Sequence, residues 1–132
     1  MTDIQVMICG AGPTGLTLAL ELAQRGVKAI LIERHDQPLH LPKMERTNPR
    51  SMEIFRRLGL ADRIRAAAYP ADVPMDIFIV SSLAKPPLVQ LEYPSVVRTR
   101  AAIAACTDGS LPREPYQLVS QYTLEQIGRA HV

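Results

Sequence analysis

The sequence predicts an α/β fold that begins with a β-α-β unit, and three observations in its first 33 residues predict it. A short apolar run from Ile4 to Cys9, rich in β-branched residues, is typical of a buried strand. Three glycines with the spacing G-x-G-x-x-G follow at once and lead into a helical pattern that ends at Gly26. A second apolar run, Lys28 to Ile32, then ends on Glu33. This order is that of a Rossmann-like fold.

The segment Gly10-Ala11-Gly12-Pro13-Thr14-Gly15 predicts a turn that binds a dinucleotide. Gly10 permits the tight turn after the strand, and Gly12 lets the backbone approach a pyrophosphate. Gly15 brings the helix close to the strand, and the positive end of that helix faces the phosphates. Pro13 suits the first helical turn because its missing N–H would have no partner there.

Glu33 lies at the distance from the glycines, roughly 20 residues, at which an acid takes the hydroxyls of an adenosine ribose. The alternative is an ordinary β-α-β turn with a solvated glutamate. Because a strand precedes the glycines and a helix and second strand follow them, the context favours the dinucleotide site.

Composition sets the bounds on the other function classes. The 132 residues suffice for one modest core, and 47% are hydrophobic and 21% charged. A net charge of +2 is too small to indicate nucleic acid or a membrane surface, and no apolar run or signal pattern indicates a membrane segment. Cys9 and Cys106 lie far apart, and we expect Cys9 to be a small buried hydrophobe in a reducing cytoplasm.

The next elements follow in order from local signals. We expect an irregular segment up to Asn48-Pro49, which begins a helix as N-cap and first-turn proline. An apolar stripe of Met52, Phe55 and Leu58 runs to Gly59, where the helix ends. The outward arginines, which are Arg50, Arg56 and Arg57, are interpreted as a solvated face. A shorter helix from Ala61 to Ala68 comes next.

From residue 71 onward the pattern changes to strands and loops. Met75 to Val80 and Leu88 to Glu92 read as two strands, and the alternation of the second predicts one wet face. Val96 to Cys106 is either a helix or a loose segment, and Asp108-Gly109-Ser110 is a turn. A final helix is expected to start near Tyr116 or Leu118.

With these pieces in order, the chain resembles the N-terminal part of the single-component FAD-dependent aromatic hydroxylases, the flavoprotein monooxygenases typified by p-hydroxybenzoate and phenol hydroxylases. The resemblance covers nearly the whole chain. It rests on the glycine segment, on Glu33-Arg34, on Pro42-Lys43-Met44 leading into Asn48-Pro49-Arg50-Ser51-Met52-Glu53, and on Glu114-Pro115-Tyr116-Gln117-Leu118 leading into Gln121-Tyr122-Thr123-Leu124-Glu125. The first segment is shared by many FAD and NAD proteins, whereas the later ones are selective.

The resemblance implies a set of FAD contacts. Residues 10–15 would line the FAD pyrophosphate, Glu33 would hold the adenosine ribose, and Arg34 would flank the adenine. Lys43 stands where many relatives have an arginine along the pyrophosphate and ribityl chain, and lysine keeps the charge but loses the bidentate fork. Gln121 would approach the ribityl chain from the later helix. Residues 1–72 would form the first part of the FAD domain, residues 73–115 the start of the substrate-domain sheet with a connecting loop, and residues 116–126 a helix that returns to the FAD domain.

The implied reaction is hydroxylation of a small phenol-like aromatic substrate with NADPH or NADH and molecular oxygen. The sequence offers no carboxylate pair, no Ser-His-Asp set and no metal-spaced cluster, and His35, His40 and His131 are isolated. We therefore predict no catalytic side chain and no metal ligand, which is typical of an oxidoreductase whose flavin performs the chemistry.

The chain departs from the family in two places. The Gly-Asp run that relatives carry near the flavin is missing, so we expect an N-terminal fragment that is inactive alone. The tail, residues 127–132, contains Gly128, which we expect to break the helix, and it reads Ile-Gly-Arg-Ala-His-Val, which matches one frame of a common sequencing adapter. We therefore expect a non-native tail. Two alternatives remain open, namely another FAD oxidoreductase of halogenase or tetracycline-modifying type, and a non-catalytic nucleotide-binding module.

Overall fold

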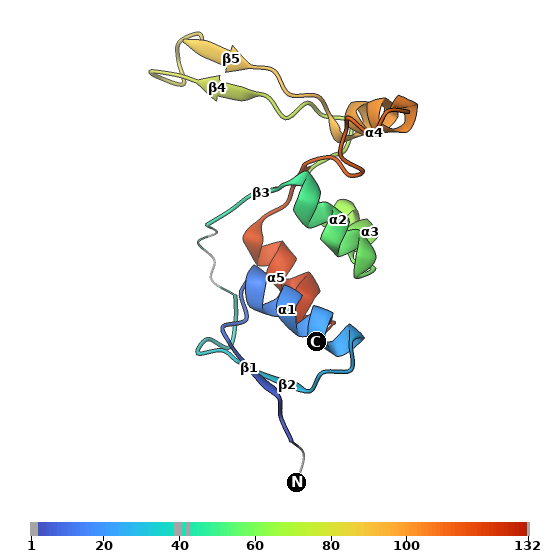
Figure 1. The fold of residues 1–132 in the computed structure, drawn as a ribbon. Helices are drawn as coiled ribbons and strands as arrows, with labels where there is room; N and C mark the ends of the chain where they lie inside the picture. The colour runs from blue at the N-terminus through green and yellow to red at the C-terminus, as the bar shows by residue number, and fades with distance from the viewer. Residues whose placement is uncertain (1–2, 39–40, 42, 132) are drawn as a thin grey trace.

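The computed structural model describes residues 3–38, 41 and 43–131 of the chain. Figure 1 shows two parts, which we call the arm and the body. The arm carries the strands Ile77–Ile79 and Val89–Leu91 and the helix Val96–Ala105, and the body carries the other helices and strands. In the body, two long helices lie between a strand pair at the bottom of the view and a further pair of helices above them. The arm, at the top, carries a β-hairpin on one side and a helix on the other. His40 and Pro42, which the sequence patterns singled out, lie outside the described residues.

The body begins with the predicted β-α-β unit. Strand β1 (Val6–Cys9) is followed by α1 (Pro13–Gln24) and β2 (Ala29–Ile32). The two strands are parallel, with Val6 opposite Ala29 and Cys9 opposite Ile32. Gly26 ends the unit's helix with a φ of +69°, a conformation that glycine adopts at little cost. The α/β fold class predicted from the sequence is confirmed.

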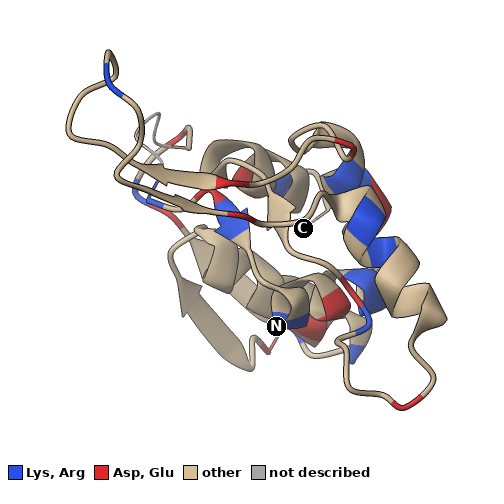
Figure 2. Cartoon of the chain, turned by 90° about the horizontal axis from the view of Figure 1, so that it is seen from above, with Lys and Arg blue, Asp and Glu red and all other residues tan. Residues whose placement is uncertain are grey.

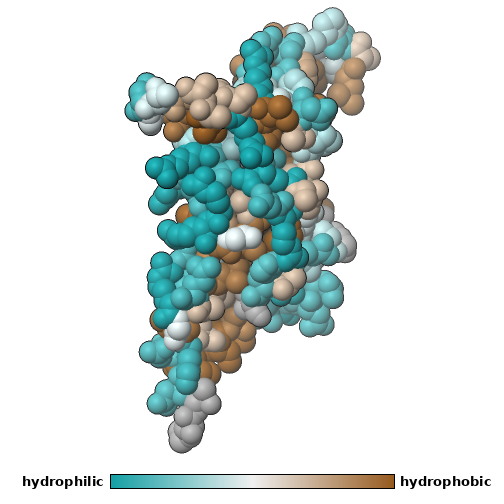
Figure 3. Space-filling model, turned by 90° about the vertical axis from the view of Figure 1, so that its right-hand side faces the viewer, coloured by the Kyte–Doolittle hydropathy of each residue, from teal (hydrophilic) through white to brown (hydrophobic). Residues whose placement is uncertain are grey.

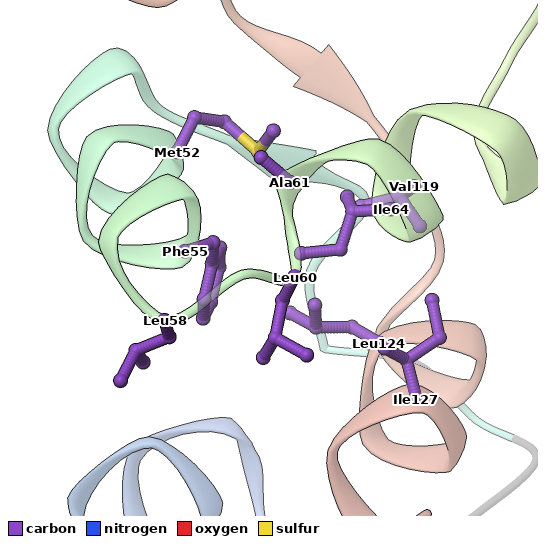
Figure 4. Packing of buried hydrophobic residues seen from close by; sticks show 9 residues of the cluster. All are labelled: Met52, Phe55, Leu58, Leu60, Ala61, Ile64, Val119, Leu124 and Ile127. Carbon is purple, nitrogen blue, oxygen red and sulfur yellow. The ribbon is translucent and has the colours of Figure 1, made fainter. Parts of the chain in front are cut away.

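A hydrophobic cluster joins three helices of the body. Helix α2 (Pro49–Arg57) begins at Asn48, whose side-chain oxygen accepts a hydrogen bond of 2.8 Å from the Ser51 N–H. Helices α3 (Ala61–Ala67) and α5 (Gln121–Arg129) complete the packing. Figure 4 shows the nine side chains of the cluster, which come from α2, α3 and α5 and from residues that flank these helices. They are Met52, Phe55, Leu58, Leu60, Ala61, Ile64, Val119, Leu124 and Ile127.

Two short strands replace structure that was predicted differently. Strand β3 (Arg46–Thr47) lies in the segment expected to be irregular, and it pairs antiparallel with β6 (Gln117–Leu118). The final helix therefore begins at Gln121 and not near residue 116 or 118. Backbone groups just before it are engaged in sheet-like bonds, since the Val119 N–H donates to the Glu45 carbonyl at 2.9 Å. Short strands made by distant residues leave little pattern in the sequence.

Helix α5 also continues further than predicted. Gly128 was expected to break it, but the helix runs through this position to Arg129. Gly128 packs so closely on α1 that an added Cβ would lie 2.9 Å from Cδ1 of Leu16. A glycine inside a helix lowers the intrinsic stability of that helix. At position 128 the missing side chain allows α5 to pack closely against α1.

The arm contains β4 (Ile77–Ile79), β5 (Val89–Leu91) and α4 (Val96–Ala105). The two strands form an antiparallel hairpin, and the segment left open between helix and loose chain is a helix capped by Ser95. Every residue of both strands is exposed, so the predicted dry face of the second strand is not seen. Figure 3 shows hydrophobic surface at this height of the molecule and again toward its lower end.

Cys9 is exposed, contrary to the expected buried position. The sheet of β1 and β2 has α1 packed against one face, where Ile8 is buried, and alternation turns Cys9 toward the other side. Within the described residues, no helix is both long enough and apolar enough to span a membrane.

Candidate functional site

A cleft of about 590 Å³ opens at the carboxyl ends of β1 and β2. This is the edge of a parallel α/β sheet at which ligands bind, because the turns into the following helices lie there. Six of the ten predicted cofactor residues line it: Gly10, Gly12, Glu33, Arg34, Lys43 and Gln121. The cleft therefore brings together residues from both ends of the chain.

The glycines of the turn differ in what requires them. Gly10 has a φ of +106°, and its N–H donates to the Ile32 carbonyl at 2.7 Å, which ties the turn to β2. A Cβ on Gly15 would lie 1.9 Å from the Gly10 oxygen, so the packing of α1 on the strand excludes any side chain there. Among the atoms that the structure describes, the nearest to a Cβ on Gly12 would be a Glu125 oxygen at 3.9 Å. No contact with the described residues therefore requires a glycine at position 12, which borders the cleft.

Glu33 holds the glycine turn as well as bordering the cleft. Its carboxylate accepts hydrogen bonds from the backbone N–H groups of Ala11 at 2.7 Å, Arg34 at 2.8 Å and His35 at 3.0 Å. The bond from Ala11, followed by that from His35, lowers the pKa of Glu33 below its usual value. The N–H of Ala11 is therefore engaged by Glu33, a link between the two strand ends that the sequence pattern did not predict.

Lys43 and Gln121 meet across the cleft although they are far apart in sequence. The Lys43 backbone N–H donates to Oε1 of Gln121 at 2.9 Å. The Gln121 amide in turn donates from Nε2 to Oε1 of Glu125 at 2.7 Å. Glu125 is only 7% exposed and was missed as a site residue. Its spacing of four from Gln121, which places both side chains on one helix face, is the signal that would have found it.

The remaining predicted residues lie beside the cleft and not in its wall. Ala11 is buried within the turn, and Gly15 is in the helix contact described above. Pro13 and Thr14 line a neighbouring groove of about 580 Å³, and Arg46 lines the same groove. The glycine turn therefore borders both the cleft and this groove.

Arg46 connects the body to the arm and was not predicted. Its guanidinium lies over the ring of Tyr93, 5.2 Å from the centroid, and 5.9 Å from the centroid of Tyr116. Cation–π contacts of this kind favour a fixed position of the guanidinium. Arg46, Tyr93 and Tyr116 are far apart in the sequence, so no local pattern could have predicted their contact.

The outward arginines of α2 are exposed, as predicted, yet they have partners. Arg50 pairs with Glu53 at 3.0 Å, and Arg57 pairs with Glu21. Arg56 reaches the buried Glu114 at 3.2 Å, which also binds Arg65 at 2.5 Å. Figure 2 shows acidic residues beside the basic ones on the helices at its right. Through its ion pairs with Arg56 of α2 and Arg65 of α3, Glu114 holds the loop before β6 against these two helices.

The described residues contain no group of three His, Cys, Asp or Glu side chains arranged to hold a metal ion. The polar groups that surround the cleft include backbone N–H donors at a helix N-terminus, two amides, two carboxylates, three cationic side chains and one imidazole. The side chains are those of Gln37, Gln121, Glu33, Glu125, Arg34, Lys43, Arg129 and His35. Such a set fits the phosphates, hydroxyls and polar rims of a dinucleotide.

Comparison with known proteins places this geometry in a family. The profile of the FAD binding domain family matches residues 3–131. FAD-dependent monooxygenase apdD of Emericella nidulans is 41% identical over 121 residues, which are 91% of this chain and 19% of that protein. The 2,4-dichlorophenol 6-monooxygenase of Cupriavidus pinatubonensis is 33% identical over 110 residues, 83% of this chain and 18% of that protein.

A solved structure agrees in fold. The ternary complex of aklavinone-11 hydroxylase with FAD and aklavinone superposes with a TM-score of 0.76 at 30% identity, over 99% of this chain and 24% of that one. The chain spans about a fifth of the length of the curated relatives that it matches.

Proposed function

Because the chain belongs to the family of FAD-dependent aromatic hydroxylases, we propose that it forms the N-terminal part of a monooxygenase and holds the ADP half of the bound FAD. The full protein would hydroxylate a small phenol-like aromatic substrate, with NADPH or NADH as reductant and molecular oxygen as the source of the added atom. We also propose the cytoplasm as its location, because it supplies these reduced nucleotides. Residues 1–132 alone would be inactive.

One observation carries the proposal, namely the convergence of both chain ends on the cleft at the glycine turn. Gly12 borders it, and no contact with the residues that the structure describes requires a glycine there. A bare backbone at this point would let the diphosphate approach the N-terminus of α1. Lys43 would add a positive charge to this wall, and Gln121 an amide beside the polyol chain.

The end of the cleft at Glu33 has groups that could bind the adenosine part of FAD. Glu33 would accept hydrogen bonds from the ribose hydroxyls with the lone pairs that its three backbone donors leave free. Arg34, the next residue and also in the cleft wall, would lie along the adenine. When bound, FAD would supply the redox and oxygen chemistry. The chain's own residues bind and orient it.

The arm would begin the substrate domain, with residues 73–115 as its first sheet and connection. Its support is the hairpin of β4 and β5, whose exposed apolar residues suit a sheet that further strands would extend. We further propose, from their match to an adapter frame alone, that residues 127–132 are not native. Against this proposal stand the burial of Ile127 in the core cluster, the packing of Gly128 on α1 and the family profile, which matches to residue 131.

The test is an assay of the full-length protein with NADPH or NADH and a panel of phenols under isotopically labelled oxygen. We expect substrate-dependent oxidation of the reduced nucleotide and one labelled atom in the hydroxylated product. A protein that binds FAD but halogenates its substrate would favour the alternative oxidoreductase. A protein that binds nucleotide without turnover of any aromatic compound would favour the non-catalytic module.

A further inference from the structure

Glu125 is a buried acid that faces the glycine turn, and the predicted cofactor contacts do not account for it. It is 7% exposed and lines the cleft. Its Oε1 lies 3.9 Å from the position that a Cβ on Gly12 would occupy. Because like charges disfavour each other at such separations, a carboxylate beside the proposed diphosphate site requires a separate explanation.

Hydrogen bonds on both sides of Gln121 give that explanation. The Oε1 atom of Gln121 accepts from the Lys43 backbone N–H at 2.9 Å, and its Nε2 donates to Glu125 at 2.7 Å. If the amide were turned over, its nitrogen would face the Lys43 N–H donor and its oxygen would face the carboxylate. Both contacts would be repulsive, so these two partners fix the orientation of the amide.

We propose that Glu125 is a positioning residue, which holds Gln121 as a hydrogen-bond donor toward the polyol chain of FAD. The proposal rests on the proposed function. With one Nε2 hydrogen bound to Glu125, the second is the donor that Gln121 has left for a ligand. Hydroxyl oxygens of the ribityl chain lie beyond the ADP portion of FAD. Glu125 therefore strengthens the binding of FAD but not that of ADP.

The experiment measures the affinities of FAD and ADP, as two separate ligands, for the full-length apoprotein. We expect Glu125→Ala to weaken FAD binding about tenfold, the effect of roughly one hydrogen bond. The variant should bind ADP at least as tightly as the wild type, because ADP makes no contact with the Gln121 amide and the nearby like charge is removed. Gln121→Ala should weaken FAD binding to the same extent. The double variant should be no weaker than either single one, because both changes remove the same contact.

Glu125→Gln is the matched control. Its side-chain oxygen can still accept the Gln121 N–H, and it carries no charge to repel the diphosphate. We expect this variant to bind FAD as tightly as the wild type or more tightly. If the site instead required a negative charge at position 125, Glu125→Gln would lose FAD affinity as Glu125→Ala does.

Three results would overturn the inference. Equal losses of FAD and ADP affinity in Glu125→Ala, together with a lowered melting temperature, would make Glu125 a purely structural residue. Additive losses in the double variant would mean that Glu125 and Gln121 act independently. An apoprotein that binds ADP normally but not FAD would refute the proposed function itself, whatever the variants do.

Discussion

The body and the arm both carry apolar residues, but the described residues bury those of the body's cluster and leave those of the arm's hairpin exposed. In the body, α2, α3 and α5 bury their apolar faces against one another. In the arm, Ile77, Phe78 and Ile79 of β4 are 37%, 54% and 49% exposed. The difference teaches that a strand's apolar pattern predicts its existence, whereas its burial depends on neighbours that other parts of a protein supply.

The sharpest test of this contrast uses the chain's two phenylalanines. Phe55 is 7% exposed in the core cluster, and Phe78 is 54% exposed on the hairpin. We expect Phe55→Ala to lower the free energy of unfolding of the chain by about 3–5 kcal/mol, since it removes a buried ring. Phe78→Ala should change it by less than about 1 kcal/mol. Urea titration of both variants measures the two values, and equal losses would mean that the hairpin is also buried.

A second pair of variants separates packing from ligand binding within the body. Gly15→Ala would place a Cβ 1.9 Å from the Gly10 oxygen, so we expect a loss of about 3 kcal/mol in stability and the loss of FAD binding. The Cβ of Gly12→Ala would meet no atom of the described residues closer than 3.9 Å. Because Gly12 is the N-cap of α1, we expect the change to cost about 1 kcal/mol or less in stability, while FAD affinity falls at least about tenfold. Thermal melts and FAD titration of both variants give the comparison. A stable Gly15→Ala protein, or tight FAD binding by Gly12→Ala, would contradict the division of roles.

Glu114 tests the contact that fastens the loop after the arm onto the body. Its buried carboxylate joins Arg56 and Arg65. Glu114→Ala would leave the largely buried Arg65 without this partner, and we expect a loss of about 2–3 kcal/mol. Asp62→Ala, at a side chain that is 99% exposed and also pairs with Arg65, is the control and should change stability little. Similar melting temperatures for the two variants would show that the buried pairing contributes nothing.

The smallest expected effect concerns the pH dependence of the glycine turn. Backbone donors, first of all Ala11, hold the pKa of Glu33 below its usual value of about 4.3. The stabilisation is therefore present at pH values above the unfolded-state pKa and is lost as the pH falls through the folded-state pKa. Melts of the wild type and Glu33→Gln should differ near neutral pH and converge on acidification. Glu92→Gln, at an exposed acid of the arm, should run parallel to the wild type. A difference that grows on acidification would contradict the hydrogen bonds to Glu33.

Local signals predicted the β-α-β unit, α2 and α3 well, because the turn residues that bound each element and its apolar face lie within a short stretch. Gly10, Gly26 and Asn48 mark ends of elements with residues whose backbone preferences are strong. The β3–β6 pair escaped prediction because its register joins Arg46 to Leu118, and two-residue strands have no periodicity to read. Cys9 was misassigned for a similar reason, since only the sheet reveals which face α1 covers.

The candidate site was predicted in its residue types more fully than in its contacts. Six residues named from motifs line the cleft. Their mutual bonds, from Lys43 to Gln121 and from Ala11 to Glu33, link positions that only the folded chain brings together. Glu125 and Arg46 were missed because an acid in a helix and a basic residue before a cap are ordinary surface patterns.

The most direct test of the central claim is the flavin content of the full-length protein as purified, followed by FAD titration of the apoprotein. We predict a yellow protein that, once stripped, regains FAD, with Glu33→Ala binding it roughly 10- to 100-fold more weakly. A colourless protein that does not bind added FAD would contradict the assignment of the cleft.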